Sequence, residues 1–456
     1  MIWAVAKNEI RINMMSLKFN LLALLCLLIF IVGSYSMVVQ FNSKMRDYAN
    51  NKKSHLQELE LQDSFDQLAI YGMKIDRPPE PMSIFASGME SVKSRIYKVN
   101  IMEITPMGGS DHERNPFVGL NGSLDILFLI KFVLSLVVIL GAYDIIAKEQ
   151  ENSLIKLNFS FNLSRYEYIL GKYLGNFMTL GAAFTISFII STLIFIIELQ
   201  ASFMTEEWLR ILLIYLISLT FISVFILCCL LVSSIFSSSN IALLSGMLIW
   251  MFFTIVIPYS VPYLIELFKS PPSISEMQIR LFNINKQCNE NAINRIKEYY
   301  NETHERPSKE WVANLREELL IESYSDKKNI KIDYDNKLQS FLTLAKNIAR
   351  ISPTSAYQSC VQILSNTDIN SENRFMNRLD LFQSEFMNYV NKKMSTGAPL
   401  SQLDKINLSK TTTFNQNYKN PLSVSLDMCL WDICLLIFYN MLFLVASVFI
   451  FNIKSF

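Results

Sequence analysis

The strongest constraint on the fold is a predominantly apolar run at residues 124–146, which ends abruptly in a charged segment. A helix of about 20 apolar residues crosses the ~30 Å hydrocarbon core of a bilayer. The run is therefore long enough to span a membrane. The segment that follows contains Lys148, Glu149, Glu151 and Lys156. Ionised side chains cost roughly 3 kcal/mol each at the bilayer centre, so we expect this segment to lie outside the lipid.

Five further apolar runs have a similar length, at residues 17–39, 174–197, 208–233, 239–264 and 425–451. Hydrophobic residues make up 51% of the chain, and its net charge is only +1. This composition favours a membrane protein and provides no basic field that would attract nucleic acid. We therefore predict an α-helical polytopic membrane protein with six transmembrane helices, whose main surroundings are the lipid bilayer and not nucleic acid.

The distribution of lysine and arginine predicts the side on which each loop lies. Positive residues precede the first apolar run, fill residues 147–173 and reappear at Lys454, whereas residues 198–207 contain none. Basic residues concentrate in cytoplasmic loops. We therefore place both termini and the 147–173 segment in the cytoplasm, with an interfacial helix at residues 1–16.

The same topology leaves two long segments outside, residues 41–123 and 266–424. The first begins as a polar continuation of the first helix and meets three prolines near Arg77; a weak strand-like alternation follows at residues 94–102. The second is as long as an independent domain. Its periodicity predicts helices at residues 276–300, 309–324, 333–351 and 372–394. We expect the two segments to build a mainly helical external domain.

The last of these helices carries one apolar stripe, which consists of Phe375, Leu379, Phe382, Phe386 and Val390. Such a stripe is most often the core of its own domain, and a docking face for a partner subunit is the alternative. Ser371 is a candidate cap for this helix.

A second helix start lies in the charged segment after the second span. Ser164 is followed three residues later by Glu167, which is a capping-box pattern. We therefore expect a new helix to begin there and to enter the third span, with residues 147–173 forming a loop and a short helix.

The motif residues of this segment are Tyr143-Asp144, Glu149, Glu151, Ser153-Leu154, Ser164-Arg165 and Gly171-Lys172-Tyr173. They resemble the loop after the second span in type-2 ABC-transporter permeases. In that family a short helix here rests on a separate ATPase subunit and passes on its motion. The resemblance implies an ATPase-coupling surface at Asp144, Glu149, Glu151, Leu154, Ser164, Arg165 and Lys172. From the residues alone, a solvated charged loop is the alternative.

Other motifs extend the resemblance along the chain. PPEPMSIFASG at residues 78–88, Asp125, Pro258 and ISPTSAYQ at residues 351–358 resemble a bacterial permease subfamily with two enlarged external loops. The resemblance implies a permease subunit in the bacterial cytoplasmic (inner) membrane. It would pair with a second copy or a paralogue and work with two cytoplasmic ABC ATPase subunits.

The chemistry of the chain agrees with a non-enzymatic subunit. It has three histidines, none in an HExxH arrangement, and no GxxxxGK[ST] phosphate loop. We expect no cofactor in this chain, with ATP and Mg²⁺ bound by the partner ATPase. The ATP-driven step would be export, extrusion or force transmission to the external domain. The rival hypothesis is a non-transporting membrane scaffold or sensor whose external domain binds a partner protein, such as a periplasmic protein.

Two charged residues fall inside predicted spans. Lys131 either lines a polar path or pairs with Asp432 in the sixth span, or its long side chain reaches the interface. Among the cysteines, Cys288 and Cys360 lie in segments assigned outside the membrane. The sequence leaves open whether these two form a disulfide or stay free, and the free state is favoured.

Overall fold

The computed structural model describes residues 1–456 apart from 111–123, 160–162, 200–202, 396–399, 412–418 and 455–456. Six of its helical segments are long and apolar enough to span a membrane, among the described residues: Leu17–Glu60, Ile126–Glu151, Arg165–Glu198, Thr205–Ile235, Ser239–Glu266 and Leu422–Ile453. The predicted fold class, a helical polytopic membrane protein, is confirmed. The chain forms two compact units, one made of residues 1–258 and 350–456 and the other of residues 259–349.

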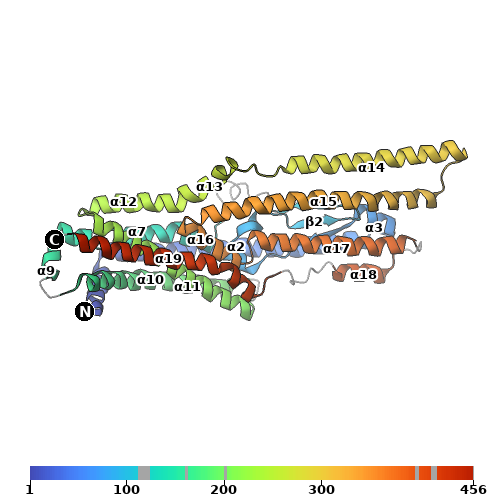
Figure 1. Ribbon diagram of the computed structural model, residues 1–456. Helices are drawn as coiled ribbons and strands as arrows, with labels where there is room; N and C mark the ends of the chain where they lie inside the picture. Colours follow the sequence, from blue (N-terminus) through green and yellow to red (C-terminus); the bar gives the residue numbers. More distant parts are fainter. Residues whose placement is uncertain (111–123, 160–162, 200–202, 396–399, 412–418, 455–456) are drawn as a thin grey trace. The chain divides into compact units, whose positions relative to one another are not determined.

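The first unit contains the bundle of spanning helices (Figure 1). Four spans are continuous helices: α2 (Leu17–Glu60), α10 (Arg165–Glu198), α11 (Thr205–Ile235) and α19 (Leu422–Ile453). The second span joins α6 (Ile126–Phe128), the π-helical turn η3 (Leu129–Leu134), α7 (Ser135–Ala142) and α8 (Ala147–Glu151). The fifth joins α12 (Ser239–Met251), a second π-helical turn η4 (Phe252–Val256) and α13 (Ile257–Glu266), which continues into the second unit.

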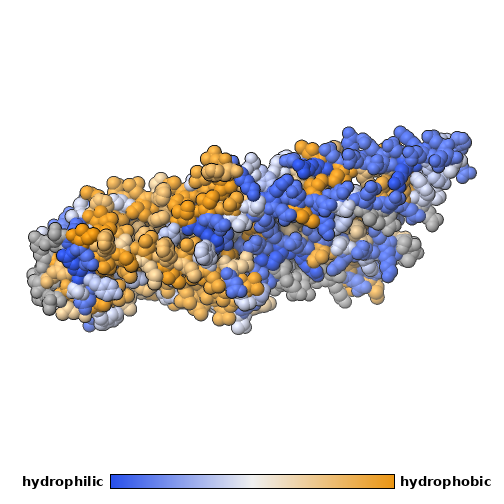
Figure 2. All heavy atoms as spheres, viewed as in Figure 1, coloured by the Kyte–Doolittle hydropathy of each residue, from blue (hydrophilic) through white to orange (hydrophobic). Residues whose placement is uncertain are grey.

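Burial identifies α11 as the centre of the bundle. In the most apolar stretch of each span, 67% of residues are buried in α11 but only 11% in α19. Apolar residues that no protein atoms cover are stable only in lipid or against another apolar surface. Figure 2 shows such residues gathered over the outer faces of the spanning helices, including α12 and α19.

The N-terminal part consists of two helices that meet at Ser16. Helix α1 (Ile2–Met15) ends there, and the Ser16 hydroxyl caps α2 (Leu17–Glu60) by accepting a hydrogen bond from the Phe19 amide at 3.2 Å. Helix α2 crosses the bundle and continues as the polar extension that the sequence predicts.

The external part of the first unit packs helices on a small sheet. The sheet is antiparallel in the order β1 (Met73–Asp76), β2 (Ile96–Val99) and β3 (Ile104–Gly108). Strand β2 lies in the predicted 94–102 stretch, whereas β1 and β3 lie outside it. Around the sheet lie α3 (Phe65–Tyr71), the 3-10 turns η1 (Pro81–Ile84) and η2 (Gly88–Ser91), α17 (Ile369–Ser395) and α18 (Gln402–Thr411).

The apolar stripe of α17 is the core of this external part. Phe375, Leu379, Phe382, Phe386 and Val390 are buried in one cluster with residues of α3, β1 and β2, so the docking-face alternative is wrong. The predicted cap is also wrong, because α17 begins before Ser371. The carboxylate of Asp368 accepts hydrogen bonds from the amides of Asn370 and Ser371 and caps the helix.

The second unit is a helical hairpin of α14 (Ile274–Thr303) and α15 (Lys309–Ala349). The rings of Tyr299 and Trp311 lie 4.6 Å apart, and Arg295 pairs with Glu318 at 3.0 Å. Helix α15 is continuous where the sequence predicted two helices. Its polar middle contains neither proline nor glycine, so loss of the apolar periodicity does not end the helix.

Residues 353–364 form α16 (Pro353–Leu364), which packs among the spanning helices, although the sequence placed it in the external domain. The Tyr357 ring stacks on Phe221 of α11 at 4.3 Å. Cys360 is buried there and its thiol points to the carbonyl of Cys429, at 3.8 Å. The Cys288 thiol instead contacts the Leu319 carbonyl at 3.7 Å. Both cysteines are free, so the disulfide considered from the sequence is not formed.

Candidate functional site

The charged segment after the second span folds into two short helices at the end of the bundle that carries both chain termini (Figure 1). Helix α7 ends at Ala142 and, after a turn, α8 follows. Ser153, with φ of 58°, then reverses the chain into α9 (Leu154–Phe159). A non-glycine residue in this left-handed conformation is uncommon, which indicates that the surrounding contacts hold it.

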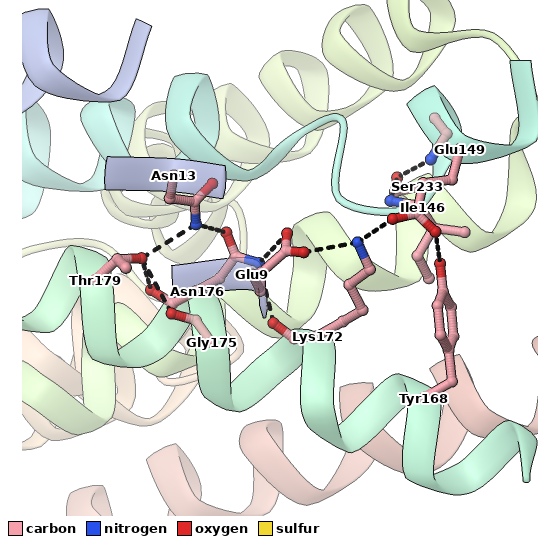
Figure 3. A network of polar contacts seen from close by, with 11 residues as sticks. Glu9, Asn13, Ile146, Glu149, Tyr168, Lys172, Gly175, Asn176, Thr179 and Ser233 are labelled. Atoms are coloured by element: carbon pink, nitrogen blue, oxygen red, sulfur yellow. Dashed lines mark hydrogen bonds and ion pairs between the residues drawn. The ribbon is translucent and has the colours of Figure 1, made fainter. Parts of the chain in front are cut away.

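A buried lysine links α8 to two other helices (Figure 3). The Lys172 ammonium on α10 lies 2.7 Å from the Glu9 carboxylate on α1 and 2.5 Å from the Glu149 carboxylate on α8. The side chains of Lys172 and Glu9 are only 6% and 7% exposed. Charge-assisted hydrogen bonds at these distances are strong, and losing one partner of a buried ion pair is costly. This triad therefore fixes α8 relative to α1 and α10.

Further polar side chains hold the members of the triad in place (Figure 3). The Tyr168 hydroxyl donates to Glu149 at 2.6 Å, and the Asn176 amide donates to Glu9 at 3.1 Å. Asn13 on α1 then donates to Asn176 at 3.0 Å and to Thr179 at 3.2 Å. Both carboxylates are thus hydrogen-bonded at both oxygens, so their orientation is fixed.

Two glycines of α10 allow α1 to approach this network. A Cβ atom at Gly171 would lie 2.5 Å from Cβ of Val5, and one at Gly175 would lie 2.5 Å from Cβ of Glu9. Any side chain at either position would push the helices apart. Gly171 of the Gly171-Lys172-Tyr173 motif is thus needed for α1 to pack close to α10 beside Lys172.

Helix α8 and the turn before it are held by three other helices. Ser233 of α11 accepts hydrogen bonds from the amides of Ile146 and Ala147 at 2.9 and 2.7 Å, which satisfies two donors at the helix start. Lys18 of α2 pairs with Asp144 at 2.7 Å. The Glu151 carboxylate accepts from the hydroxyl of Ser239 on α12 at 2.8 Å.

The start of α10 is tied to the end of α19. Ser164 and Glu167 form the capping box that the sequence predicts. Arg165 donates to the carbonyls of Phe451, Asn452 and Lys454 at 3.0, 2.6 and 3.1 Å. These are orphaned acceptors at a helix C-terminus, where a cation is favourable.

The structure thus divides the seven predicted coupling residues into three groups. Glu149 and Lys172 meet in the triad. Asp144 and Arg165 tie the segment to α2 and α19, and Ser164 caps α10. Glu151 and Leu154 lie at the surface, Leu154 with 46% of its area exposed. Glu9 and Asn13 were missed by the sequence reasoning. Their four-residue spacing on an otherwise apolar helix face was the available signal.

The two intramembrane charges each bind partners other than the one considered from the sequence. Lys131 donates to Gln358 at 2.9 Å, whereas Asp432 pairs with Arg350 at 2.5 Å and accepts from Ser359 at 2.8 Å. Helix α16 and the residues before it provide these partners. Lys131 is 7% exposed, so its side chain does not reach an interface either.

These features define a class of protein, a multi-pass helical membrane protein in which a polar junction at one end of the bundle fixes a short loop helix. The sequence model of the family described as ABC-2 family transporter protein matches residues 3–454. The chain therefore belongs to this family and is a membrane permease subunit of an ABC transporter. A search of curated proteins finds no match.

Proposed function

We propose that this permease is driven by separate ABC ATPase subunits, which bind ATP and Mg²⁺ and dock at α8 and α9. The observation that carries the proposal is the buried triad of Glu9, Lys172 and Glu149. A docked subunit that displaces α8 would pull directly on α1 and α10 through it. A loop that was only solvated would not need a buried ion pair between three helices.

In this proposal the end of the bundle that holds both termini faces the cytoplasm of a bacterial cell, and the protein lies in the inner membrane. Two copies, or this chain and a paralogue, enclose the path, since closed dimers are the common solution for such subunits. ATP-driven motion then serves export, extrusion or force transmission to the external part. Helix α2 supports the last option because it runs unbroken from the bundle into that part.

Substitution of the exposed α9 leucine tests the docking surface. Leu154→Asp is expected to abolish co-purification of the ATPase and leave the melting temperature of the permease unchanged. Leu61→Asp is the matched control, because Leu61 is 79% exposed at the far end of α2. Retention of the ATPase at the wild-type ratio by Leu154→Asp would overturn the proposed docking site. Failure of the wild-type chain to bind any ATPase would favour the scaffold hypothesis.

A further inference from the structure

Helix α16 lies against four spans and contacts them through polar side chains. Its Tyr357 hydroxyl is 2.9 Å from the hydroxyl of Ser218 on α11, and its Gln358 accepts from Lys131 of the second span. Ser359 donates to Asp432 of α19. The Asp432 side chain is fully buried. Each of these buried groups would be costly without its partner, so the position of α16 is specified by them.

The contacts of α16 with the second and fifth spans fall on their two π-helical turns. Lys131 belongs to η3, and the segment before α16 contacts η4, where Ser352 donates to the Phe253 carbonyl at 2.5 Å. The hydroxyls of Thr254 in η4 and Thr354 in α16 are 3.5 Å apart. Single π-helical turns are rare and occur frequently at functional sites, where they interrupt the regular helix ladder.

The residues just before α16 are clamped as well. Arg350 pairs with Asp432, and the Ile351 carbonyl accepts from the Tyr439 hydroxyl of α19 at 2.5 Å. Arg350 directly follows Ala349, the last residue of α15. The chain therefore leaves the hairpin and is at once fixed to α19 and to η4.

We propose that Arg350, Asp432 and Lys131 are positioning residues that make α16 a mechanical link between the two π-helical turns and the hairpin helix α15. When the second and fifth spans tilt, η3 and η4 carry α16 with them, and α16 moves the residue to which α15 is joined. The element that α16 moves in this way is the hairpin of the same chain. The proposal rests on the proposed function, because ATPase-driven motion has to reach these spans.

The first test measures the link in the permease alone, in lipid nanodiscs, by hydrogen exchange. Arg350→Met removes the clamp, and exchange is expected to rise at least tenfold in residues 353–364 and also in residues 252–256. Arg350→Lys keeps the cation and is expected to keep most of the protection. The Arg350→Asp, Asp432→Arg double variant is expected to restore it. Unchanged exchange at residues 252–256 in Arg350→Met would overturn the link.

The second test follows the hairpin in the complex with its ATPase. Genetically encoded spin labels at Asn336 of α15 and Glu385 of α17, both exposed, report one distance with and without ATP. A nucleotide-dependent shift is expected in the wild type and its loss in Arg350→Met. The control Lys286→Met, which removes an exposed pair within α14, should keep the shift.

The outcomes of the two tests separate the two proposals. The link is overturned if Arg350→Met retains the nucleotide-dependent distance change of the wild type. It is also overturned if Arg350→Met loses this change and the Arg350→Asp, Asp432→Arg double variant does not recover it. In both cases the ATPase assignment stands. Absence of ATPase binding in the wild type overturns the proposed function, and the exchange measurement then still decides whether α16 holds the π-helical turns.

Discussion

At the scale of single residues, the molecule depends on charges that are buried and fully paired. Lys172 is the clearest case, since one ammonium serves two carboxylates on different helices. A buried pair of this kind adds little net stability compared with apolar packing. Its effect is to specify one arrangement, because the arrangement that separates the charges is far less stable.

Removal of the ammonium should therefore be costly. Lys172→Met leaves Glu9 and Glu149 close together without their cation, and we expect a loss of about 3–5 kcal/mol, seen as a large drop in melting temperature. The Glu9→Gln, Lys172→Met double variant also removes one of the two carboxylates. Its loss of stability should therefore be smaller than the sum of the losses in Glu9→Gln and in Lys172→Met. Additive losses in this double-mutant cycle would show that the two groups do not interact.

Glu80 provides a second residue-scale prediction, in the external part. Its carboxylate is buried 2.9 Å from the Lys419 ammonium. Burial outweighs the attraction of Lys419 and, with repulsion from Glu90 and Glu207, raises the pKa of Glu80 from 4.5 to about 7. The folded chain therefore holds a proton that the unfolded chain releases near pH 4.5.

The stabilisation from this proton is complete below pH 4.5 and is lost as the pH rises through about 7. Melting temperatures measured from pH 5 to pH 8 should fall more steeply in the wild type than in Glu80→Gln. Parallel profiles for the two proteins would contradict the assignment of this proton to Glu80.

At the scale of elements, close packing of α1 on α10 governs the position of the coupling segment. Gly175→Ala would place a Cβ atom 2.5 Å from that of Glu9, and overpacking of this kind costs about 1–3 kcal/mol. We expect a lower melting temperature and faster proteolysis of α1. Gly181→Ala is the matched control on the same helix, because its new Cβ would meet only Leu219 at an ordinary 3.8 Å. Equal behaviour of the two variants would argue against a packing role for Gly175.

The elements also show what the sequence could and could not predict. The spans follow from apolar length, and the start of α10 follows from Ser164 and Glu167, because these signals are local. The position of α16 could not be predicted, since its partners Ser218 and Asp432 are 139 and 73 residues away from the residues they bind. Loss of periodicity near residue 330 suggested a break in α15 that does not exist, because an exposed helix needs no apolar stripe there.

The same difference between local signals and partners distant in the sequence applies to the candidate site. The motif residues Glu149 and Lys172 could be singled out from the sequence, but Glu9, the second carboxylate that Lys172 binds, is 163 residues from Lys172. Arg165 looked like a surface charge and instead binds the last carbonyls of α19. A sequence pattern identifies which charges are unusual, whereas the packing of α1, α10 and α19 determines which of them meet.

At the scale of the whole molecule, this permease subunit has external elements that are structurally continuous with its spans. Helix α2 reaches the external sheet without a break, and α17 is joined to the bundle by α16. Apolar residues on the outer faces of α12 and α19 remain uncovered by the chain itself, as expected for surfaces that meet lipid or a second permease (Figure 2).

The most direct measurement of the central claim is the composition of the complex in its native membrane. The tagged permease would be purified gently, and each chain that accompanies it would be identified and counted by mass. We expect a soluble subunit with a phosphate-binding loop, two copies of it, and two permease chains in each complex. A permease that is purified without any such subunit, yet with a stoichiometric external or membrane partner, would contradict the account and favour a scaffold.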